Sequence, residues 1–340
     1  MLSVNAIPSA IQTPLNTPPG ELPHRWLKHA VWRAANSCML GGLISWPLEQ
    51  SWVRVEQLSM PLHNLGRPFD GARLVHLSDL HCGMLVREKH LRRHVEIVNA
   101  LDADFVAITG DFITTGSRRY ARTVAKVLGD VKAARGVVAC LGNHDYGRWH
   151  PKGWGEVKGI ADYLSERLTN AGISVLRNAS RKFVVGEAML QFVGLEDYWS
   201  GQYDAEVAFE KVDCEHPVIA LAHNPDAAPQ LAAMGAEWIL SGHTHGKATP
   251  DTRFWDIVYP TRYKQFIGGR YALGRGSLLY VNRGIGNAWR VRAMHLPEIT
   301  LFSLRNATQG QRSLLAPARQ TGDRGAHSVR LPHRLHQLEA

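Results

Sequence analysis

Side chains of metal-ligand type stand directly after five apolar runs of this 340-residue chain. The first run, LVHLS at residues 74–78, leads into Asp79 and His81. Residues i and i+2 of an extended chain point to the same side, so this carboxylate and this imidazole converge. Groups of the same kind follow the other four runs: Asp111, Asn143, His223, His243 and His245. Carboxylate, amide and imidazole groups bind divalent metals, so the pattern predicts a metal site.

The apolar runs that precede these groups belong to a longer series with the length of β-strands. The series comprises residues 72–77, 104–109, 136–141, 188–195, 217–222, 237–241, 277–281 and 298–304. Apolar residues at helical spacing fill three of the gaps: Leu91, Val95 and Val98; Val124, Val127, Leu128 and Val131; Ile160, Leu164 and Leu168, before Gly172 as an expected C-cap. Residues 181–185 and 189–194 are typical of a hairpin. The alternation predicts a layered α/β fold with central mixed β-sheets flanked by helices.

Ligands of α/β sheets bind beyond the carboxyl ends of the strands, so the five strand ends are expected to form one crevice. Each segment alone has an ordinary explanation: Asp79 as a helix cap, Asp111 as a turn residue, His223 as a hydrogen-bonded core histidine. The glycines before Asp111, Asn143 and His243 could simply permit tight turns. Seven polar ligands crowded into one crevice are costly without a cation, however, so the set as a whole favours the metal site.

The order of the motifs, D-x-H, G-D, G-N-H-D, a single His and then G-H-x-H, resembles that of the calcineurin-like metallophosphoesterases. The resemblance covers about residues 66–304. The stretches GRPFDGARLVHLSDLHCG, LAHNPD, GHTHG and YVNRGIG look like the bacterial phosphodiesterase branch of the YkuE and YaeI type. The resemblance implies the metallophosphoesterase fold and a hydrolase that acts on phosphoester bonds.

The resemblance also implies a site for two divalent metal ions. The implied ligands are Asp79, His81 and His245 for one ion, Asn143, His223 and His243 for the other, and Asp111 for both. A carboxylate can bridge two ions because it has two oxygens, whereas an imidazole has a single free nitrogen for a metal. Mixed imidazole, carboxylate and amide ligation suits Mn, Fe or Zn and does not select among them.

His144, next to the implied ligand Asn143, is the predicted general acid for the leaving oxygen, because imidazole titrates near neutral pH. In the protein-phosphatase branch an aspartate supports the equivalent histidine, but Thr114 stands at that position here. Asp145 either orients His144 or forms the turn. Arg283, in the N-R-G-I-G loop after the run at 277–281, is a predicted substrate ligand that would bind a phosphate, with a surface arginine as the alternative.

The two ends of the chain differ from this central part. Residues 1–23 carry five prolines and predict a mobile leader. Residues 24–65 predict a basic, tryptophan-bearing helix and a linker; the helix either lies on a membrane surface as a peripheral anchor or packs on the main domain. Residues 66–305 are the expected catalytic domain, and residues 306–340 predict a disordered basic tail. The side of the membrane stays open, with a cytoplasmic location as the alternative.

Charge and cysteine content restrict the partners. The net charge is +9, but no basic patch interleaved with aromatic residues is visible in the core, so nucleic acid is not the expected partner. The four cysteines form no C-x-x-C pair, which indicates free thiols rather than a structural zinc site. Cys82 follows His81 and could be a soft ligand, but a small buried filler is the favoured interpretation.

The expected activity is hydrolysis of a phosphodiester or pyrophosphate by a metal-activated water. Relatives in the resembled branch include pyrophosphatases of lipid precursors, so a lipid-linked phosphoester similar to UDP-2,3-diacylglucosamine is the expected kind of substrate. A nuclease or phosphomonoesterase of the same fold is the alternative. A non-catalytic binding module is disfavoured, because such proteins typically lose ligands or the acid histidine and this chain keeps them all.

Overall fold

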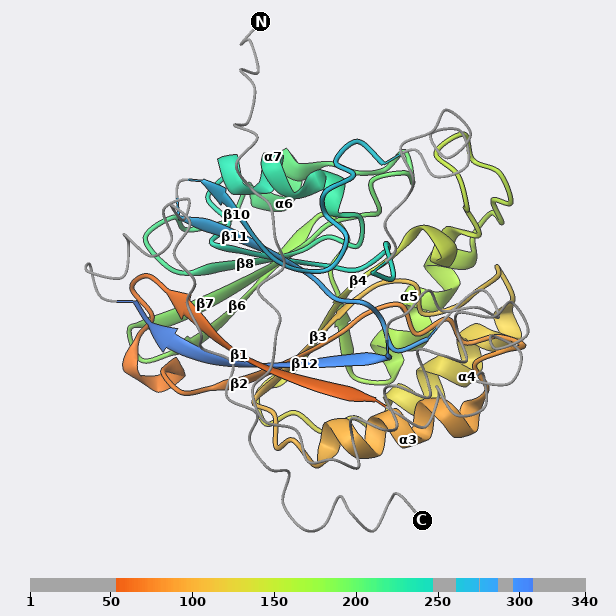
Figure 1. Ribbon diagram of the computed structural model, residues 1–340, viewed down its shortest axis with the longest axis horizontal. Helices are drawn as coiled ribbons and strands as arrows, with labels where there is room; N and C mark the ends of the chain where they lie inside the picture. Colours follow the sequence, from red (N-terminus) through yellow and green to blue (C-terminus); the bar gives the residue numbers. More distant parts are fainter. Residues whose placement is uncertain (1–52, 247–260, 275, 287–295, 308–340) are drawn as a thin grey trace, which may run out of the picture.

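Two six-stranded sheets lie face to face at the centre of the molecule (Figure 1). The computed structural model describes residues 53–246, 261–274, 276–286 and 296–307. The strands of the first sheet, in spatial order, are β1 (Arg54–Leu62), β12 (Glu298–Asn306), β2 (Arg73–Leu77), β3 (Phe105–Thr109), β4 (Gly136–Cys140) and β5 (Ile173–Val175). Strands β2 to β5 are parallel, β12 is antiparallel to β2, and β1 is parallel to β12.

The second sheet has the same mixed character. In spatial order its strands are β10 (Gly269–Gly274), β11 (Ser277–Val281), β9 (Trp238–Ser241), β8 (Val218–Leu221), β7 (Ala188–Gly194) and β6 (Ala179–Val185). Strands β11, β9, β8 and β7 are parallel, and the two edge strands are antiparallel to their neighbours. The carboxyl ends of the central strands of both sheets are therefore available to build one site.

Helices cover the outer face of each sheet, which gives four layers (Figure 1). Those on the first sheet are α3 (Glu88–Asn99), α4 (Arg118–Leu128) and α5 (Ile160–Asn170), and those on the second are α6 (Ala205–Phe209) and α7 (Ala228–Ala233). Three 3-10 turns complete the described elements: η1 (Arg67–Phe69), η2 (Asn143–Tyr146) and η3 (Pro225–Ala227). Between the sheets, large side chains such as Phe105, Trp238 and Phe302 fill the core.

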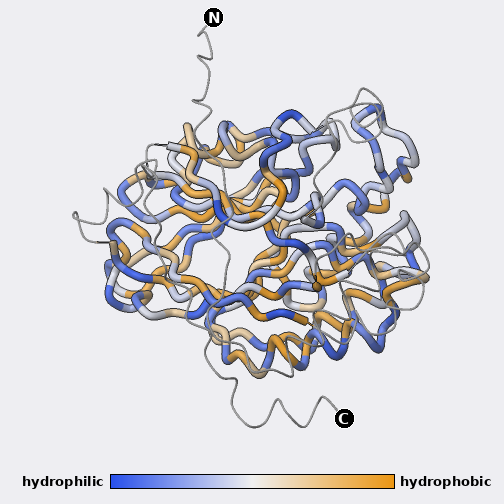
Figure 2. Tube along the Cα trace, viewed as in Figure 1, coloured by the Kyte–Doolittle hydropathy of each residue, from blue (hydrophilic) through white to orange (hydrophobic). Residues whose placement is uncertain are grey.

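The layered packing explains the sequence pattern. Strands such as β3 and β8 are apolar without alternation because both of their faces are covered. In α4 only one side is apolar: Val124, Val127 and Leu128 are buried against the first sheet. Figure 2 shows apolar strand segments in the interior and alternating apolar and polar positions along the helices.

The predicted layered α/β fold with mixed sheets is confirmed. All eight apolar runs form strands, and the three spaced patterns form α3, α4 and α5. The hairpin is tighter than its sequence indicated, because Val185 pairs with Ala188 and leaves a two-residue turn. Val131 lies beyond the end of α4. Strands β5 and β10, and β1 at the edge of the first sheet, were not anticipated from the sequence.

Strand β1 changes the lower boundary of the folded region. Residues 54–62, which the sequence placed in the segment of membrane-associating helix and linker, pair along their whole length with β12. Met60 and Leu62 are fully buried in the core between the sheets. The sheet therefore begins before residue 66.

The helix expected within residues 24–47 lies outside the described residues, as do the leader at 1–23 and nearly all of the tail at 306–340. Within the described part of the chain, no helix has the length and apolar character needed to cross a membrane.

Replacing Leu62 by alanine tests whether β1 belongs to the core. We expect Leu62→Ala to lower the free energy of unfolding by about 2–5 kcal/mol, since a buried leucine leaves a cavity behind. Urea denaturation followed by circular dichroism measures the change. Val184→Ala on β6, where the side chain is 58% exposed, is the matched control and should cost far less. Equal, small losses in both variants would show that β1 is dispensable.

Candidate metal centre

The predicted ligands come together at the carboxyl ends of five strands. Asp79 and His81 follow β2, Asp111 follows β3, and Asn143 opens η2 after β4. From the second sheet, His223 follows β8, and His243 and His245 follow β9. Almost all of these side chains are fully buried. The predicted ligands at the strand ends thus converge, and both sheets contribute to the group.

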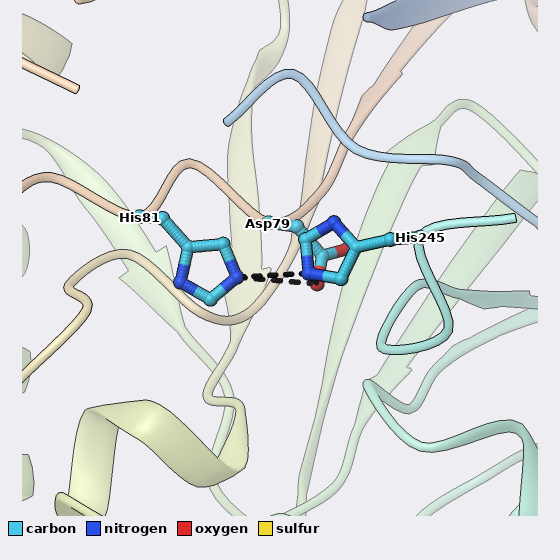
Figure 3. Close-up of side chains that lie close together, drawn as sticks. All are labelled: Asp79, His81 and His245. Atoms are coloured by element: carbon cyan, nitrogen blue, oxygen red, sulfur yellow. Dashed lines mark hydrogen bonds and ion pairs between the residues drawn. The ribbon is translucent and has the colours of Figure 1, made fainter. Parts of the chain in front are cut away.

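Asp79, His81 and His245 form the first group of converging ligands (Figure 3). The Nε2 atoms of the two histidines are 3.0 Å apart, and Oδ1 of Asp79 lies 3.3 Å from Nε2 of His245 and 3.8 Å from Nε2 of His81. Nitrogen and oxygen ligands bind divalent ions such as zinc at about 2.0–2.2 Å, which places neighbouring ligand atoms roughly 3 Å apart. The spacing of this group therefore fits a cation at its centre.

Asp111 lies between this group and a second one. Its Oδ2 atom is 3.6 Å from Nε2 of His81 and 3.2 Å from Nε2 of His223. Its Oδ1 atom accepts a hydrogen bond from the backbone N–H of His144 at 2.9 Å. One carboxylate thus faces imidazoles of both groups, as a bridging ligand must.

The second group contains Asn143, His223 and His243. Nδ1 of His243 lies 3.0 Å from Oδ1 of Asn143, and the rings of His223 and His243 are 5.2 Å apart between centroids. The His223 Nδ1–H donates to the carbonyl of Thr109, which directs Nε2 towards Asp111. Such a bond from the second ring nitrogen fixes the tautomer that a metal-binding histidine needs.

Burial is the largest influence on the pKa values of these groups. It raises the pKa of Asp79 to about 6 and lowers the pKa of His243 to about 3. For Asp111, burial would raise the pKa, but the charge of His223 and of other histidines outweighs it and holds the pKa well below its usual value. A neutral His243 and an ionised Asp111 are the forms in which these side chains bind metals.

The backbone at the site is strained. Five of the predicted ligands have a left-handed backbone: Asp79, His81, Asp111, His243 and His245, with φ between 49° and 72°. This conformation costs a residue other than glycine about 1–3 kcal/mol and persists only where the surroundings impose it. Here backbone hydrogen bonds impose it, such as the one from His81 N–H to the carbonyl of Asp111 at 2.8 Å.

The glycines that precede ligands provide space for carboxylates. A Cβ atom on Gly142 would lie 2.3 Å from Oδ1 of Asp111, and one on Gly242 would lie 2.2 Å from Oδ2 of Asp79. Neither distance is compatible with a side chain. Close packing of backbone against the ligands therefore explains these two glycines better than turn formation does.

His144 stands beside the carboxylate of Asp111, and a backbone group orients it. Its Nδ1–H donates to the carbonyl of Thr114 at 2.8 Å, and one nitrogen of its ring lies within 4.8 Å of one ligand atom each of His81 and Asp111. Asp145 instead accepts the backbone N–H groups of Ile113 and Gly142 at 3.1 and 2.9 Å. Of the two alternatives for Asp145, the structure therefore supports turn formation.

The structure adds a sixth strand end to the site. Trp199 follows β7, and its ring meets the ring of His243 edge-on, with centroids 4.7 Å apart. Asp197, on the same loop, is buried and accepts the backbone N–H of Trp199. The acidic pair Glu196-Asp197 directly follows a predicted strand, and this position is the signal that could have indicated the sixth strand end.

Arg283 pairs with the buried Glu298 at 2.5 Å, and its side chain is 12% exposed. Its loop packs against the first ligand, since the Gly286 N–H donates to the Asp79 carbonyl at 2.7 Å. The role of Arg283 as a phosphate ligand stays a prediction.

Cys82 is buried, and burial raises the pKa of its thiol to about 12, which agrees with a structural filler.

Comparison with known proteins agrees with this geometry. The profile described as "Calcineurin-like phosphoesterase" matches residues 72–247, more than half of the chain. The chain therefore belongs to the calcineurin-like phosphoesterase family, as its motifs predicted.

Three curated relatives illustrate the range of the family. A zebrafish (Danio rerio) "Transmembrane protein with metallophosphoesterase domain" is 32% identical over 68% of this chain and 53% of its own length. The "UDP-2,3-diacylglucosamine pyrophosphatase LpxG" of Chlamydia trachomatis is 27% identical over 75% of this chain and 90% of that protein. "Phosphodiesterase YaeI" of Escherichia coli is 26% identical over 68% of this chain and 82% of that protein. This chain thus spans about half of the zebrafish relative and most of the bacterial ones.

A methyl group on Gly242 tests the close packing of backbone against Asp79. We expect Gly242→Ala to weaken metal binding by about 10- to 100-fold, as loss of a ligand's supporting contacts typically does. Metal titration monitored by calorimetry measures the affinity. In the control variant Gly129→Ala, the new Cβ has no neighbour closer than 3.5 Å, and the affinity should not change. Unaltered affinity in Gly242→Ala would contradict the assignment of Asp79 as a ligand.

Proposed function

We propose that this chain hydrolyses a phosphodiester or a pyrophosphate with two divalent metal ions as cofactors. The observation that carries the proposal is the convergence of buried carboxylate and imidazole atoms in three overlapping groups: Asp79, His81 and His245; His81, Asp111 and His144; Asp79, Asp111 and His223. So many buried polar atoms in one crevice are costly unless cations compensate them. Membership of the calcineurin-like phosphoesterase family supports the same activity.

In this proposal two ions are bound, each by three ligands of its own and by the shared Asp111. Asp79, His81 and His245 hold the first, Asn143, His223 and His243 hold the second, and Asp111 contributes to both. Ions at these places would act as Lewis acids towards phosphoryl oxygens and would lower the pKa of a water molecule. The donor set suits manganese, iron or zinc.

His144 supplies the proton for the leaving oxygen. Because its Nδ1–H is donated to the carbonyl of Thr114, Nε2 is the atom that can hold and release the catalytic proton. The backbone N–H of the same residue is bound to Asp111, so the acid is held at a fixed place relative to the bridging carboxylate. A carbonyl thus takes the orienting role that an aspartate has in the protein-phosphatase branch.

A lipid-linked phosphoester is the substrate class that we propose. Two observations support it: LpxG, whose name gives UDP-2,3-diacylglucosamine as its substrate, matches three quarters of this chain, and residues 24–47 have the pattern of a basic interfacial helix. A peripheral location on a membrane follows from the same pattern. The name of the zebrafish relative, which calls it a transmembrane protein, supports an association with a membrane.

Removal of Asp111 tests the metal-dependent activity. Wild-type protein loaded with manganese, iron or zinc should hydrolyse bis-p-nitrophenyl phosphate, and chelation should abolish turnover until metal is returned. We expect Asp111→Ala to lose at least about 100-fold in metal affinity, since even loss of a supporting group costs 10- to 100-fold. Asp130→Ala, at a surface aspartate, is the control. Equal turnover by Asp111→Ala and wild type would favour a non-catalytic binding module.

Replacement of His144 separates acid catalysis from metal binding. We expect His144→Asn to retain the metal content of the wild type and to lose about 10²–10⁴-fold in turnover. The loss should be larger for diphenyl phosphate than for bis-p-nitrophenyl phosphate, because phenolate is the more basic leaving group and needs the proton more. Product release followed spectroscopically gives both rates. Loss of metal, or equal losses for both substrates, would show that His144 has another role.

A further inference from the structure

Exposed apolar side chains gather on the loops beside His144. Seven large apolar residues are exposed in the described part of the chain, and four of them lie on two of these loops: Met84 (80%), Trp149 (62%), Trp154 (53%) and Val157 (40%). We call these four the apolar rim. A cluster of this kind next to a catalytic site indicates a surface that contacts a partner.

The loops of the apolar rim are packed together around the acid histidine. The loop at 82–86, which carries Met84, pairs with the segment after Asp111 through Cys82 and Ile113. That segment continues to Thr114, whose carbonyl holds His144, and then to Gly116, where an added Cβ would lie 2.4 Å from Val157. The two loops that carry the rim are therefore joined through the segment at 113–116.

The tryptophan loop at residues 147–159 is anchored to a predicted ligand. The backbone N–H of Arg148 donates to the carbonyl of Asn143, and the Asn143 side chain donates to the carbonyl of Arg148. In Figure 1 this yellow-green segment, which leads into α5, projects at the upper right of the molecule. A partner bound at the loop would therefore be held close to the metal ligands.

Each of the two exposed indoles packs against a residue of its own loop. Trp154 stacks on the buried ring of His150, with centroids 4.2 Å apart and an angle of 17°. Trp149 lies directly over Gly155, because any Cβ there would overlap its ring. Each ring thus has one supported face, although more than half of its surface stays exposed.

The charge around the rim selects the kind of partner. Basic side chains close to the rim residues in the sequence are exposed: Arg87, Lys89, Arg118, Arg119, Lys152 and Lys158. The acidic side chains nearby, Glu88 and Glu156, are both paired with arginines. Exposed tryptophans together with lysine and arginine are typical of surfaces that sit in the head-group region of an anionic membrane.

We propose that the apolar rim inserts into an anionic lipid surface and so presents a lipid-borne phosphoester to His144. The proposal rests on the proposed function for its substrate, but the insertion itself does not depend on catalysis. It assigns to the catalytic domain a membrane contact of its own, separate from the helix expected within residues 24–47.

A fluorescent label at residue 84 tests the insertion without any need for turnover. In the full chain with Cys38→Ser and Cys214→Ser, an environment-sensitive dye is attached through Met84→Cys, and in a matched protein through Val207→Cys on α6, where the side chain is 54% exposed. Vesicles of phosphatidylcholine and phosphatidylglycerol should shift the emission of the dye at 84 to the blue and leave the dye at 207 unchanged. No shift at 84, or equal shifts at both positions, would overturn the proposal.

A second experiment measures presentation of the substrate. The ratio of turnover of hexadecyl p-nitrophenyl phosphate in these vesicles to that of ethyl p-nitrophenyl phosphate in solution should fall about tenfold when Trp149→Gln and Trp154→Gln are combined. The ratio should stay within about twofold of wild type in Val207→Gln, since single surface substitutions have small effects. An equal loss on both substrates would mean that the tryptophans bind the substrate itself and would overturn the proposal. Absence of turnover in wild type would instead reject the proposed function, while the labelling result would still stand.

Discussion

The crowding of ionisable side chains around Asp111 is the constraint on which the rest of the structure depends. Its carboxylate has the imidazoles of His81 and His223 within 3.6 Å, and all three side chains are buried. Burial of charged groups is unfavourable unless opposite charges or metals compensate it. Without metal, the ion pair between Asp111 and a protonated His223 compensates part of the cost. A cation bound at Nε2 of His223 would replace that proton and take over the compensation. Metal binding and stability of this region are therefore expected to be linked.

The two-sheet architecture makes this crowding possible. A single parallel sheet offers ligands from a few neighbouring strand ends, whereas here β2, β3 and β4 of one sheet meet β8 and β9 of the other. The left-handed backbone of the loops that carry the candidate ligands is energetically unfavourable. The large apolar core between the sheets stabilises the fold enough to offset this cost. Gly142 and Gly242 let the loops from different sheets approach until their backbones touch the carboxylates. The positions of the candidate ligands relative to one another are thus set by packing between the two sheets and not by any one loop.

The parts of this structure that the sequence predicts are those with a local signal. Continuous apolar runs indicated eight of the strands, and the polar groups at their ends indicated the candidate ligands that the structure brings together. Strand β1 escaped notice because an edge strand with polar residues at several positions lacks such a run, and β5 is only three residues long. The support of His144 could not be found from residue types, because the group that provides it is the backbone carbonyl of Thr114. The left-handed conformation of the ligands arises from contacts between distant segments and has no sequence pattern of its own.

The same reasoning connects the acid histidine with the apolar rim. His144 is only partly buried, and the loops that hold it also carry Met84 and Trp149. Exposed apolar side chains do not stabilise an isolated domain, because they remain in contact with water. Here they stand on loops that also position His144 and Asn143. A membrane that covers the rim would exclude water from the entrance to the site, and electrostatic interactions strengthen when water is excluded. On this view the surface that brings the phosphoester to His144 also improves the environment in which the proton is transferred.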